Sequence, residues 1–299
     1  MRSPIFRALC AASFPFFASA ASAGDFFVKP SLKQTAGSGG YEATSASVDF
    51  GSSFHLKPGF DAYHSNSSSG TVKTYSLRAS YDTDGQYGYS VNGGWSPLND
   101  GYKNHFIGGE LTRDIDFDDE DSTEEARGFI SNLNLSAGLT HTTHTDSFQL
   151  QTVKGRRVVL LRPAALDIDE TDLTGSAAVT ARDTVFELDV LKAVYNKDLA
   201  ALSARGAQAT QLAGLVSTIQ GFPNANASFR VQFDQVPVVS PYVSYTYTSY
   251  AIAVPISQAY SLGAVGSAAG LRLDAAYQRF SQKTGADINY YSLRASYRF

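Results

Sequence analysis

The sequence NYYSLRASYRF, residues 289–299, ends the chain and alternates in character at every position. One set of alternate residues is aromatic or apolar, namely Tyr291, Leu293, Ala295, Tyr297 and Phe299. The other set carries hydroxyl groups and positive charge, namely Tyr290, Ser292, Arg294, Ser296 and Arg298. Successive side chains of a β-strand point to opposite faces, so this stretch predicts a strand with lipid on one side and water on the other.

This last strand resembles that of the Gram-negative outer-membrane β-barrel proteins, in which the chain commonly ends on Phe with aromatic or apolar residues at every second place before it. The residues that carry the resemblance are Tyr291, Leu293, Ala295, Tyr297 and Phe299. Arg294 departs from the pattern, because many of these strands have Gly there. The resemblance implies a location among outer-membrane lipid and lipopolysaccharide, and a last strand that the barrel-assembly machinery reads as an insertion signal. The resemblance implies a barrel architecture and does not imply any particular activity.

The same phrase occurs a second time near the start of the chain. Residues 75–82 read YSLRASYD and residues 291–298 read YSLRASYR. Two distant strands therefore share one wall chemistry, and we expect them to run in the same direction. If the last strand descends to the periplasm, as the resemblance implies, the turn at residues 82–85 is periplasmic too, where barrel connections are short.

The N-terminus has the pattern of a secretory signal peptide. Arg2 and Arg7 precede the apolar run 8–17, and two small-x-small triplets then lead to Gly24. These features predict a signal peptide over residues 1–23 and a mature chain over residues 24–299. The single cysteine, Cys10, lies in the apolar run, so the predicted mature chain has no disulfide.

Composition and charge narrow the class of protein. No stretch after the signal peptide approaches the roughly 20 continuous apolar residues of a spanning helix, which excludes a helical membrane protein. The chain has 24 basic and 28 acidic residues, and removing Arg2 and Arg7 leaves 22 against 28, a net charge of −6. This balance gives no support to a nucleic-acid partner. The 17 Tyr, 19 Phe and 25 Gly suit an all-β protein, for which a soluble periplasmic β-protein is the alternative to a membrane barrel.

Alternation recurs along most of the mature chain. Counting every alternating segment gives about sixteen strands, but residues 148–153 and 158–165 are the weakest pair and could instead form a loop hairpin. About fourteen strands remain without that pair, and strands long enough to cross a bilayer fit the mature length at about that number. The sequence thus predicts an all-β fold, a single closed antiparallel transmembrane barrel of about 14 strands within a range of about 12–16.

Residues 188–221 break the two-residue period. Apolar residues there follow helical spacing in two runs, from Leu188 to Leu202 and from Leu212 to Ile219. We therefore expect a partly helical insertion, which counting back from the C-terminus places on the extracellular side. The insertion has two alternative positions: packed on the rim, or folded into the lumen as a constriction or plug.

Charged residues on the inward side of the predicted strands give the strongest functional pattern. Basic residues gather where the barrel closes, namely Lys29, Lys33, Arg272, Arg294 and Arg298. Acidic residues lie across from them, namely Glu110, Asp114 and Asp116. Opposed arcs of this kind set up a transverse field and bias which solutes pass, so we predict a porin-like channel for small polar solutes, lined by these residues.

Two alternatives to a channel stay open. The inward charges could pair across strands and fill a narrow polar core, as they do in small barrels. The barrel could also be non-conducting and act through its surface as an adhesin, receptor or structural anchor. The oligomeric state is left open by the sequence.

Hydrolase chemistry finds no support in the histidine positions. The phospholipase and lipid A deacylase barrels place His and Ser two residues apart on one face, whereas His64 and Ser65 are adjacent. A protease resembling the omptins would need Asp114 and Asp116 near His144 and Asp146. The predicted strand order places those two pairs at opposite ends of the barrel, where they cannot share a catalytic water. We therefore predict no catalytic residues.

Metal and cofactor sites find no support either. His141 and His144 are three residues apart, so on a strand they face opposite sides and cannot bind one metal ion. We expect both to be solvated histidines at the rim. The acidic run 116–125 lacks the ordered spacing of a calcium loop, and no nucleotide or zinc motif is present. No metal and no cofactor are predicted.

Overall fold

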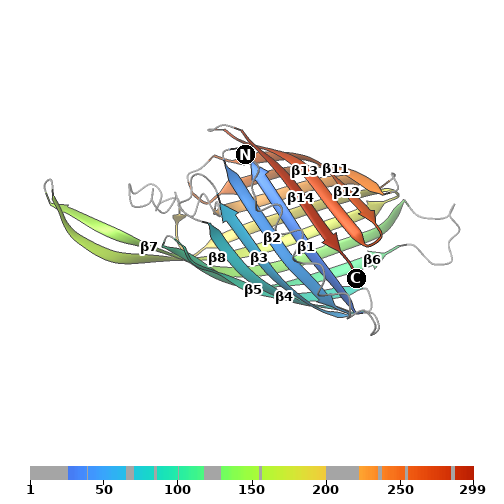
Figure 1. Ribbon diagram of the computed structural model, residues 1–299, viewed down its shortest axis with the longest axis horizontal. Helices are drawn as coiled ribbons and strands as arrows, with labels where there is room; N and C mark the ends of the chain where they lie inside the picture. Colours follow the sequence, from blue (N-terminus) through green and yellow to red (C-terminus); the bar gives the residue numbers. More distant parts are fainter. Residues whose placement is uncertain are drawn as a thin grey trace.

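Fourteen antiparallel strands close into a barrel in the computed structural model of the chain (Figure 1). The structure describes residues 26–38, 40–64, 71–83, 86–99, 101–117, 129–154, 157–199, 222–234, 238–252, 255–283 and 287–299, and only the backbone over 146–154 and 157–165. The predicted signal peptide, residues 1–23, lies outside this described part. Within it, no helix has the length and apolar character needed to cross a membrane.

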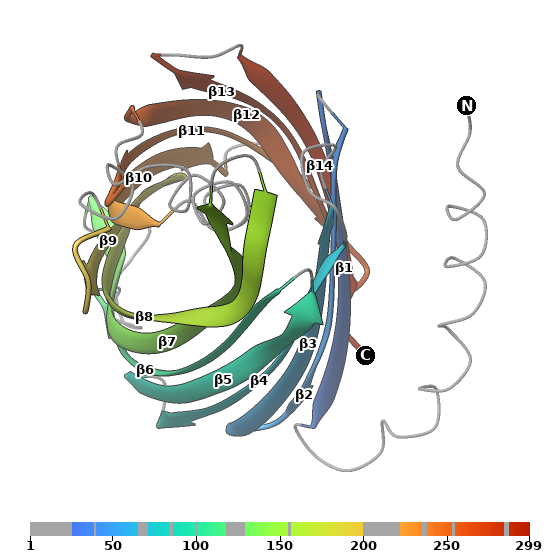
Figure 2. The same ribbon diagram turned by 90° about the vertical axis from the view of Figure 1, so that its left-hand side faces the viewer.

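The strands follow one another around the barrel in chain order, and β1 pairs with β14 to close it (Figure 2). The first seven are β1 (Phe27–Gly37), β2 (Tyr41–Gly51), β3 (Phe54–His64), β4 (Val72–Thr83), β5 (Tyr87–Asn99), β6 (Tyr102–Asp116) and β7 (Ile130–Lys154). The others are β8 (Arg157–Ala181), β9 (Thr184–Tyr195), β10 (Pro223–Phe233), β11 (Val239–Tyr250), β12 (Ser257–Ala268), β13 (Leu271–Gln282) and β14 (Ile288–Tyr297). This confirms the predicted closed antiparallel barrel of about 14 strands.

The outer face of the barrel carries the large apolar side chains. Leu77, Val91 and Leu262 are 52%, 59% and 61% exposed, and Leu293 of the last strand is 48% exposed. An apolar surface that surrounds a barrel is costly in water and favourable in lipid. The alternation seen in the sequence therefore separates a lipid-facing side from a luminal side on each strand.

The two ends of the barrel differ. At the end that holds Phe299, residues 182–183 join β8 to β9 and residues 269–270 join β12 to β13. At the other end, β7 and β8 continue as a long hairpin past the rest of the barrel (Figure 1). The weak segments 148–153 and 158–165 lie in this hairpin, which confirms the hairpin interpretation. Both copies of the repeated phrase, on β4 and β14, run toward the end with Phe299.

The predicted helical insertion over 188–221 is wrong in its first part. Residues 188–195 belong to strand β9, with Leu188, Val190 and Val194 facing outward at 46%, 46% and 54% exposure. Helical spacing was suggested because Leu191 and Tyr195 add apolar residues on the inward side of the same strand. The Tyr195 ring points inward and packs against a buried cluster at the barrel mouth. Residues 200–221 lie outside the described residues.

Candidate functional site

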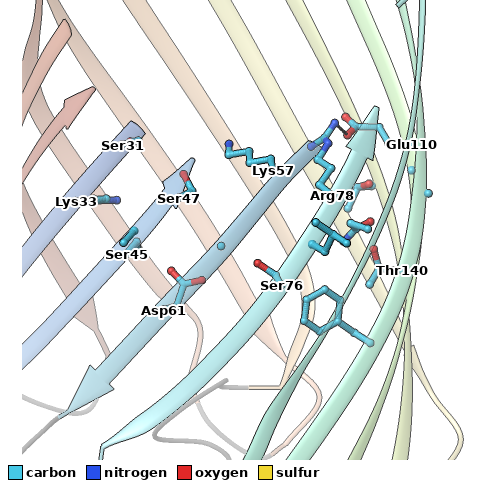
Figure 3. Close-up of a pocket in the computed structure, with 18 of the residues that line it drawn as sticks. Ser31, Lys33, Ser45, Ser47, Lys57, Asp61, Ser76, Arg78, Glu110 and Thr140 are labelled. Atoms are coloured by element: carbon cyan, nitrogen blue, oxygen red, sulfur yellow. Dashed lines mark hydrogen bonds and ion pairs between the residues drawn. The ribbon is translucent and has the colours of Figure 1, made fainter. Parts of the chain in front are cut away.

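A luminal cavity of about 500 Å³ lies against the inner faces of β1 to β8 and β14 (Figure 3). Small polar residues dominate its wall, among them Ser31, Ser45, Ser47 and Ser76. Gly59 leaves room between them, because a Cβ at this position would lie 2.5 Å from the Ser76 Oγ. The absence of large side chains along this row keeps this part of the lumen hollow.

Lys33 and Arg294 lie at directly paired positions on β1 and β14, the two strands that close the barrel. Both line the cavity. Neither has a carboxylate within 4.0 Å among the described residues. Asp61 and Asp274 act on Lys33 electrostatically from farther away. Asp274 is the register partner of Arg294 on its other side. Lys33 and Arg294 are like charges on neighbouring strands and repel each other.

A second pair of cations lies on the neighbouring wall. Lys57 and Arg78 are paired on β3 and β4, and both line the same cavity (Figure 3). Arg78 Nη2 donates to Glu110 Oε2 at 2.7 Å, across the intervening strand β5. Lys57 has no carboxylate within 4.0 Å among the described residues. The cavity wall thus holds four cationic side chains and two carboxylates, Asp61 and Glu110.

A smaller cavity of about 320 Å³ adjoins the first and shares Lys33 and Arg294 with it. On its far wall the guanidinium of Arg230 lies 3.8 Å above the ring of Tyr242. The hydroxyl of Tyr242 donates to Asp274 Oδ1 at 2.9 Å. Glu187 and Asp189 of β9 also line this cavity, so its charges of both signs are equal in number.

The structure brings together three of the predicted pore-lining residues, Lys33, Arg294 and Glu110. Glu110 differs from the expectation of a free acidic arc, because it is bound to Arg78. The others lie toward the end with Phe299 and line neither cavity. Of these, Asp114 accepts a hydrogen bond from Asn132 Nδ2 at 2.7 Å, and the Arg298 guanidinium lies 4.7 Å from the centroid of the Phe27 ring. The other three are described by their register partners on the neighbouring strand: Asn132 for Asp116, Asp49 for Lys29 and Ser296 for Arg272.

Lys57, Asp61 and Arg78 line the cavity but were absent from the sequence prediction. A signal for each was present. Lys57 and Asp61 share the inward parity of residues 55–63, as alternation requires. Arg78 holds the place in the phrase YSLRASYD that Arg294 holds in YSLRASYR. The repeat was used to predict strand direction, but not to predict that Arg78, like Arg294, faces the lumen.

His144 contradicts the expectation of a solvated rim histidine, since it is only 1% exposed. Its Nε2 lies 2.8 Å from Glu170 Oε2 and its Nδ1 lies 2.8 Å from the Tyr102 hydroxyl. Tyr195 donates to the other oxygen of Glu170 at 2.7 Å. A carboxylate only accepts, so the ring proton belongs on Nε2 and the Tyr102 hydroxyl donates to Nδ1.

This polar cluster forms part of a packed region at the barrel end away from Phe299. Ile168, Leu199, Phe222 and Ile252 are buried against Tyr102. The Phe222 ring meets the rings of His144 and Tyr195 edge-on, each at 5.7 Å between centroids. The residues on either side of the undescribed segment 200–221, Leu199 and Phe222, are therefore both anchored in this region.

The outward side of β7 and β8 next to this cluster is polar. His141 bonds to Thr171 at 3.1 Å, and Thr143 donates to Asp169 at 2.9 Å. Polar side chains in these positions do not suit contact with lipid tails, so this part of the hairpin lies beyond the apolar band. His141 faces outward and His144 inward, as their spacing predicts, and the described residues contain no group of three or more potential ligands that could hold a metal ion.

The closed barrel, its apolar exterior and its charged, serine-lined interior define the class: a porin-like outer-membrane β-barrel. No family model matches the sequence, and no curated protein matches it.

Several solved structures resemble the barrel at low identity. CdiB from Acinetobacter baumannii gives a TM-score of 0.47 at 11% identity over 92% of this chain, which spans 60% of CdiB. OccK8 (OprE) of Pseudomonas aeruginosa gives a TM-score of 0.44 at 10% identity, covering 92% of this chain and 98% of that one. A loop L8 deletion mutant of OmpT, an outer membrane protein of Vibrio cholerae, gives 0.43 at 11% identity, with coverage of 92% and 98%.

Proposed function

We propose that this protein is a channel of the Gram-negative outer membrane that lets small polar solutes cross. One observation carries the proposal: the lumen contains adjoining cavities of about 500 and 320 Å³ whose walls are polar and charged. A barrel that served only as an anchor would gain stability by filling this space with packed side chains. Unpaired cations on a hollow wall instead suit water and passing solutes.

The charges of the lumen would act on a solute as it passes. Lys33 and Arg294 line one side of the smaller cavity, with Asp274 as the register partner of Arg294. Glu187 and Asp189 line the other side, with Arg230 as the register partner of Glu187, so each side keeps a net charge of one unit and the two are opposite in sign. Fixed charges of opposite sign across a narrow aqueous space set up a transverse field, which orients dipolar solutes and slows apolar ones. In this proposal Glu187 and Asp189 of β9 supply the acidic side of the field, in place of Asp114 and Asp116.

Swelling of proteoliposomes tests transport directly. Purified protein that shows heat-modifiable migration on a gel, and is therefore folded, is reconstituted and exposed to a neutral pentose. The rate of swelling is expected to exceed that of protein-free liposomes and to fall as the sugar becomes larger. Swelling no faster than in the protein-free control would overturn the proposal, because the folded lumen would then be closed.

Export and assembly form part of the same proposal. Residues 1–23 would direct the chain across the inner membrane, and the last strand would then be recognised by the barrel-assembly machinery. Tyr291, Leu293 and Phe299 are exposed at 61%, 48% and 37%, as a recognition surface requires. Lipid and lipopolysaccharide would then surround the apolar band.

A non-conducting barrel that acts through its surface is the second candidate, and the long β7–β8 hairpin favours it. Beyond the register pair Asp146–Leu166, β8 is the only strand among the described residues that pairs with β7. Replacing residues 147–165 by a two-residue turn should leave swelling unchanged if the barrel is a channel. If the barrel acts through its surface, wild-type protein shows no swelling, and the shortened protein loses adhesion of cells to their partner surface.

A further inference from the structure

Lys33 and Arg294 are cations of the lumen that have a cavity beside them and no carboxylate within 4.0 Å in the described part of the chain. We propose that they form a subsite for the carboxylate of a small polyhydroxylated acid, and that the serine row beside them binds its hydroxyl groups. This names a substrate class for the channel and so rests on the proposed function, although binding can be measured without transport.

The charge of the cavity wall favours an anion. Four cationic side chains and two carboxylates line it, and one of the carboxylates, Glu110, is held by Arg78 at 2.7 Å. Asp274 is the register partner of Arg294 and lines the adjoining cavity, where the Tyr242 hydroxyl donates to it. Even with Asp61 and Asp274 counted, the cations around Lys33 and Arg294 outnumber the carboxylates on the wall of the larger cavity. A bound carboxylate would relieve the mutual repulsion of Lys33 and Arg294, and the planar Arg294 guanidinium can donate to both of its oxygens.

The second observation concerns the serine hydroxyls. Ser31 pairs with Ser47, Ser47 with Gly59, and Gly59 with Ser76, so these residues form one row across β1 to β4. Ser45 pairs with Lys33 one step along. None of the four serine hydroxyls has a hydrogen-bond partner among the residues that the structure describes.

Other hydroxyl pairs in the lumen behave differently. Thr74 bonds to Ser96 at 2.7 Å, Ser136 to Ser176 at 2.8 Å, and Ser228 to Thr246 at 3.0 Å. Cross-strand pairing is thus the common arrangement in this barrel, and the serine row departs from it next to the unpaired cations. Hydroxyl groups can both donate and accept, so such a row matches the hydroxyls of a sugar acid better than an apolar acid.

Gluconate and glucitol provide a matched pair of probes, because they share a six-carbon polyhydroxylated chain and differ in one terminal carboxylate. Equilibrium dialysis of the detergent-solubilised full chain against radiolabelled gluconate or glucitol measures binding without any need for conduction. The wild type is expected to bind gluconate about tenfold or more tighter than glucitol, as charge-assisted hydrogen bonds imply. The double variant Lys33→Gln with Arg294→Gln is expected to bind both alike.

Lys73→Gln is the matched control, since it removes one exposed positive charge from the outward side of β4. Heat-modifiable migration shows that each variant is folded. Equal binding of gluconate and glucitol by the wild type, or a gluconate preference that survives in the double variant, would overturn the subsite. Proteoliposome swelling distinguishes failure of the subsite from failure of the channel function. Swelling without a preference for gluconate would refute the subsite and support the channel. A preference for gluconate without swelling would support the subsite and refute transport.

Discussion

Arg78 and Arg294 hold the same place in two copies of one phrase and line the same luminal cavity, yet only Arg78 is bound to a carboxylate. Its partner, Glu110, lies at 2.7 Å. Arg294 instead lies in register between Lys33 of β1 and Asp274 of β13, with no carboxylate within 4.0 Å among the described residues. The same phrase therefore contributes to two different pairs: the neutral ion pair Arg78–Glu110, and the cationic pair Lys33–Arg294 that borders the cavity.

Removing the charge of Glu110 and removing that of Arg78 should shift the ion preference of the channel in opposite directions. Glu110→Gln frees Arg78 and should shift the reversal potential in a KCl gradient toward anions. Arg78→Gln frees Glu110 and should shift it toward cations, because fixed charges in a lumen select counter-ions. The double variant keeps the net charge of the pair and should return near the wild-type value. Unchanged reversal potentials in both single variants would show that the pair lies outside the path of the ions.

The two histidines on β7 should differ sharply in their effect on stability. His144→Ala leaves Glu170, 5% exposed, without its main partner and should lower the free energy of unfolding by about 3 kcal/mol. His141→Ala removes an outward side chain and should change it by less than about 0.5 kcal/mol. The free energy of unfolding of each variant is measured by denaturant titration in detergent, with heat-modifiable migration on a gel as the readout of the folded fraction. Equal effects would contradict the buried network around His144.

Gly263 makes room for Tyr242 on the luminal side of β12. A Cβ there would lie 2.4 Å from the Tyr242 Cζ, so Gly263→Ala must displace a ring that is 7% exposed and holds Asp274. We expect a loss of about 1–3 kcal/mol in the free energy of unfolding. Gly175→Ala is the control, because its Cβ would meet Val190 at an ordinary 3.5 Å. A Gly263→Ala protein as stable as the Gly175→Ala protein would refute this tight packing.

The C-terminal Phe should matter more for assembly than another outward-facing Phe that is at least as exposed. Phe299 donates its backbone N–H to Val28 O at 3.0 Å, next to the seam that closes the barrel, and its ring meets the Tyr297 ring edge-on with the centroids 4.5 Å apart. Phe299→Ala should therefore reduce the amount of folded protein in the outer-membrane fraction several-fold. Phe229→Ala, which removes a ring that is 45% exposed on β10, should have a smaller effect. Equal yields of the two variants would count against an assembly signal.

The barrel itself was predictable because its signal is local. Alternation depends only on residues two apart, so the sequence of β14 predicts its lipid side and its luminal side without knowledge of any neighbour. The repeat then predicted that β4 runs in the same direction as β14. The short segments 148–153 and 158–165 were harder, because a hairpin beyond the membrane alternates less clearly than a spanning one.

Partners across strands were not predictable in the same way. Inward parity places Glu110 and Arg78 in the lumen, but their contact requires the register of β4, β5 and β6 together. His144 was expected in solvent because its own strand is polar there. Its burial depends on Phe222 and Leu199, which come from distant parts of the chain. Tyr195 packs against the same cluster, and its inward ring contributed to the helical spacing predicted over what is strand β9.

Current through a planar lipid bilayer tests the central claim, an aqueous lumen lined by Lys33 and Arg294, most directly. The folded wild-type protein is predicted to give stable current steps, and Lys33→Glu with Arg294→Glu to shift the reversal potential in a KCl gradient toward cations. The Lys73→Gln control is predicted to match the wild type. Absence of current steps from folded wild-type protein, or a reversal potential that ignores the double charge reversal, would contradict the claim.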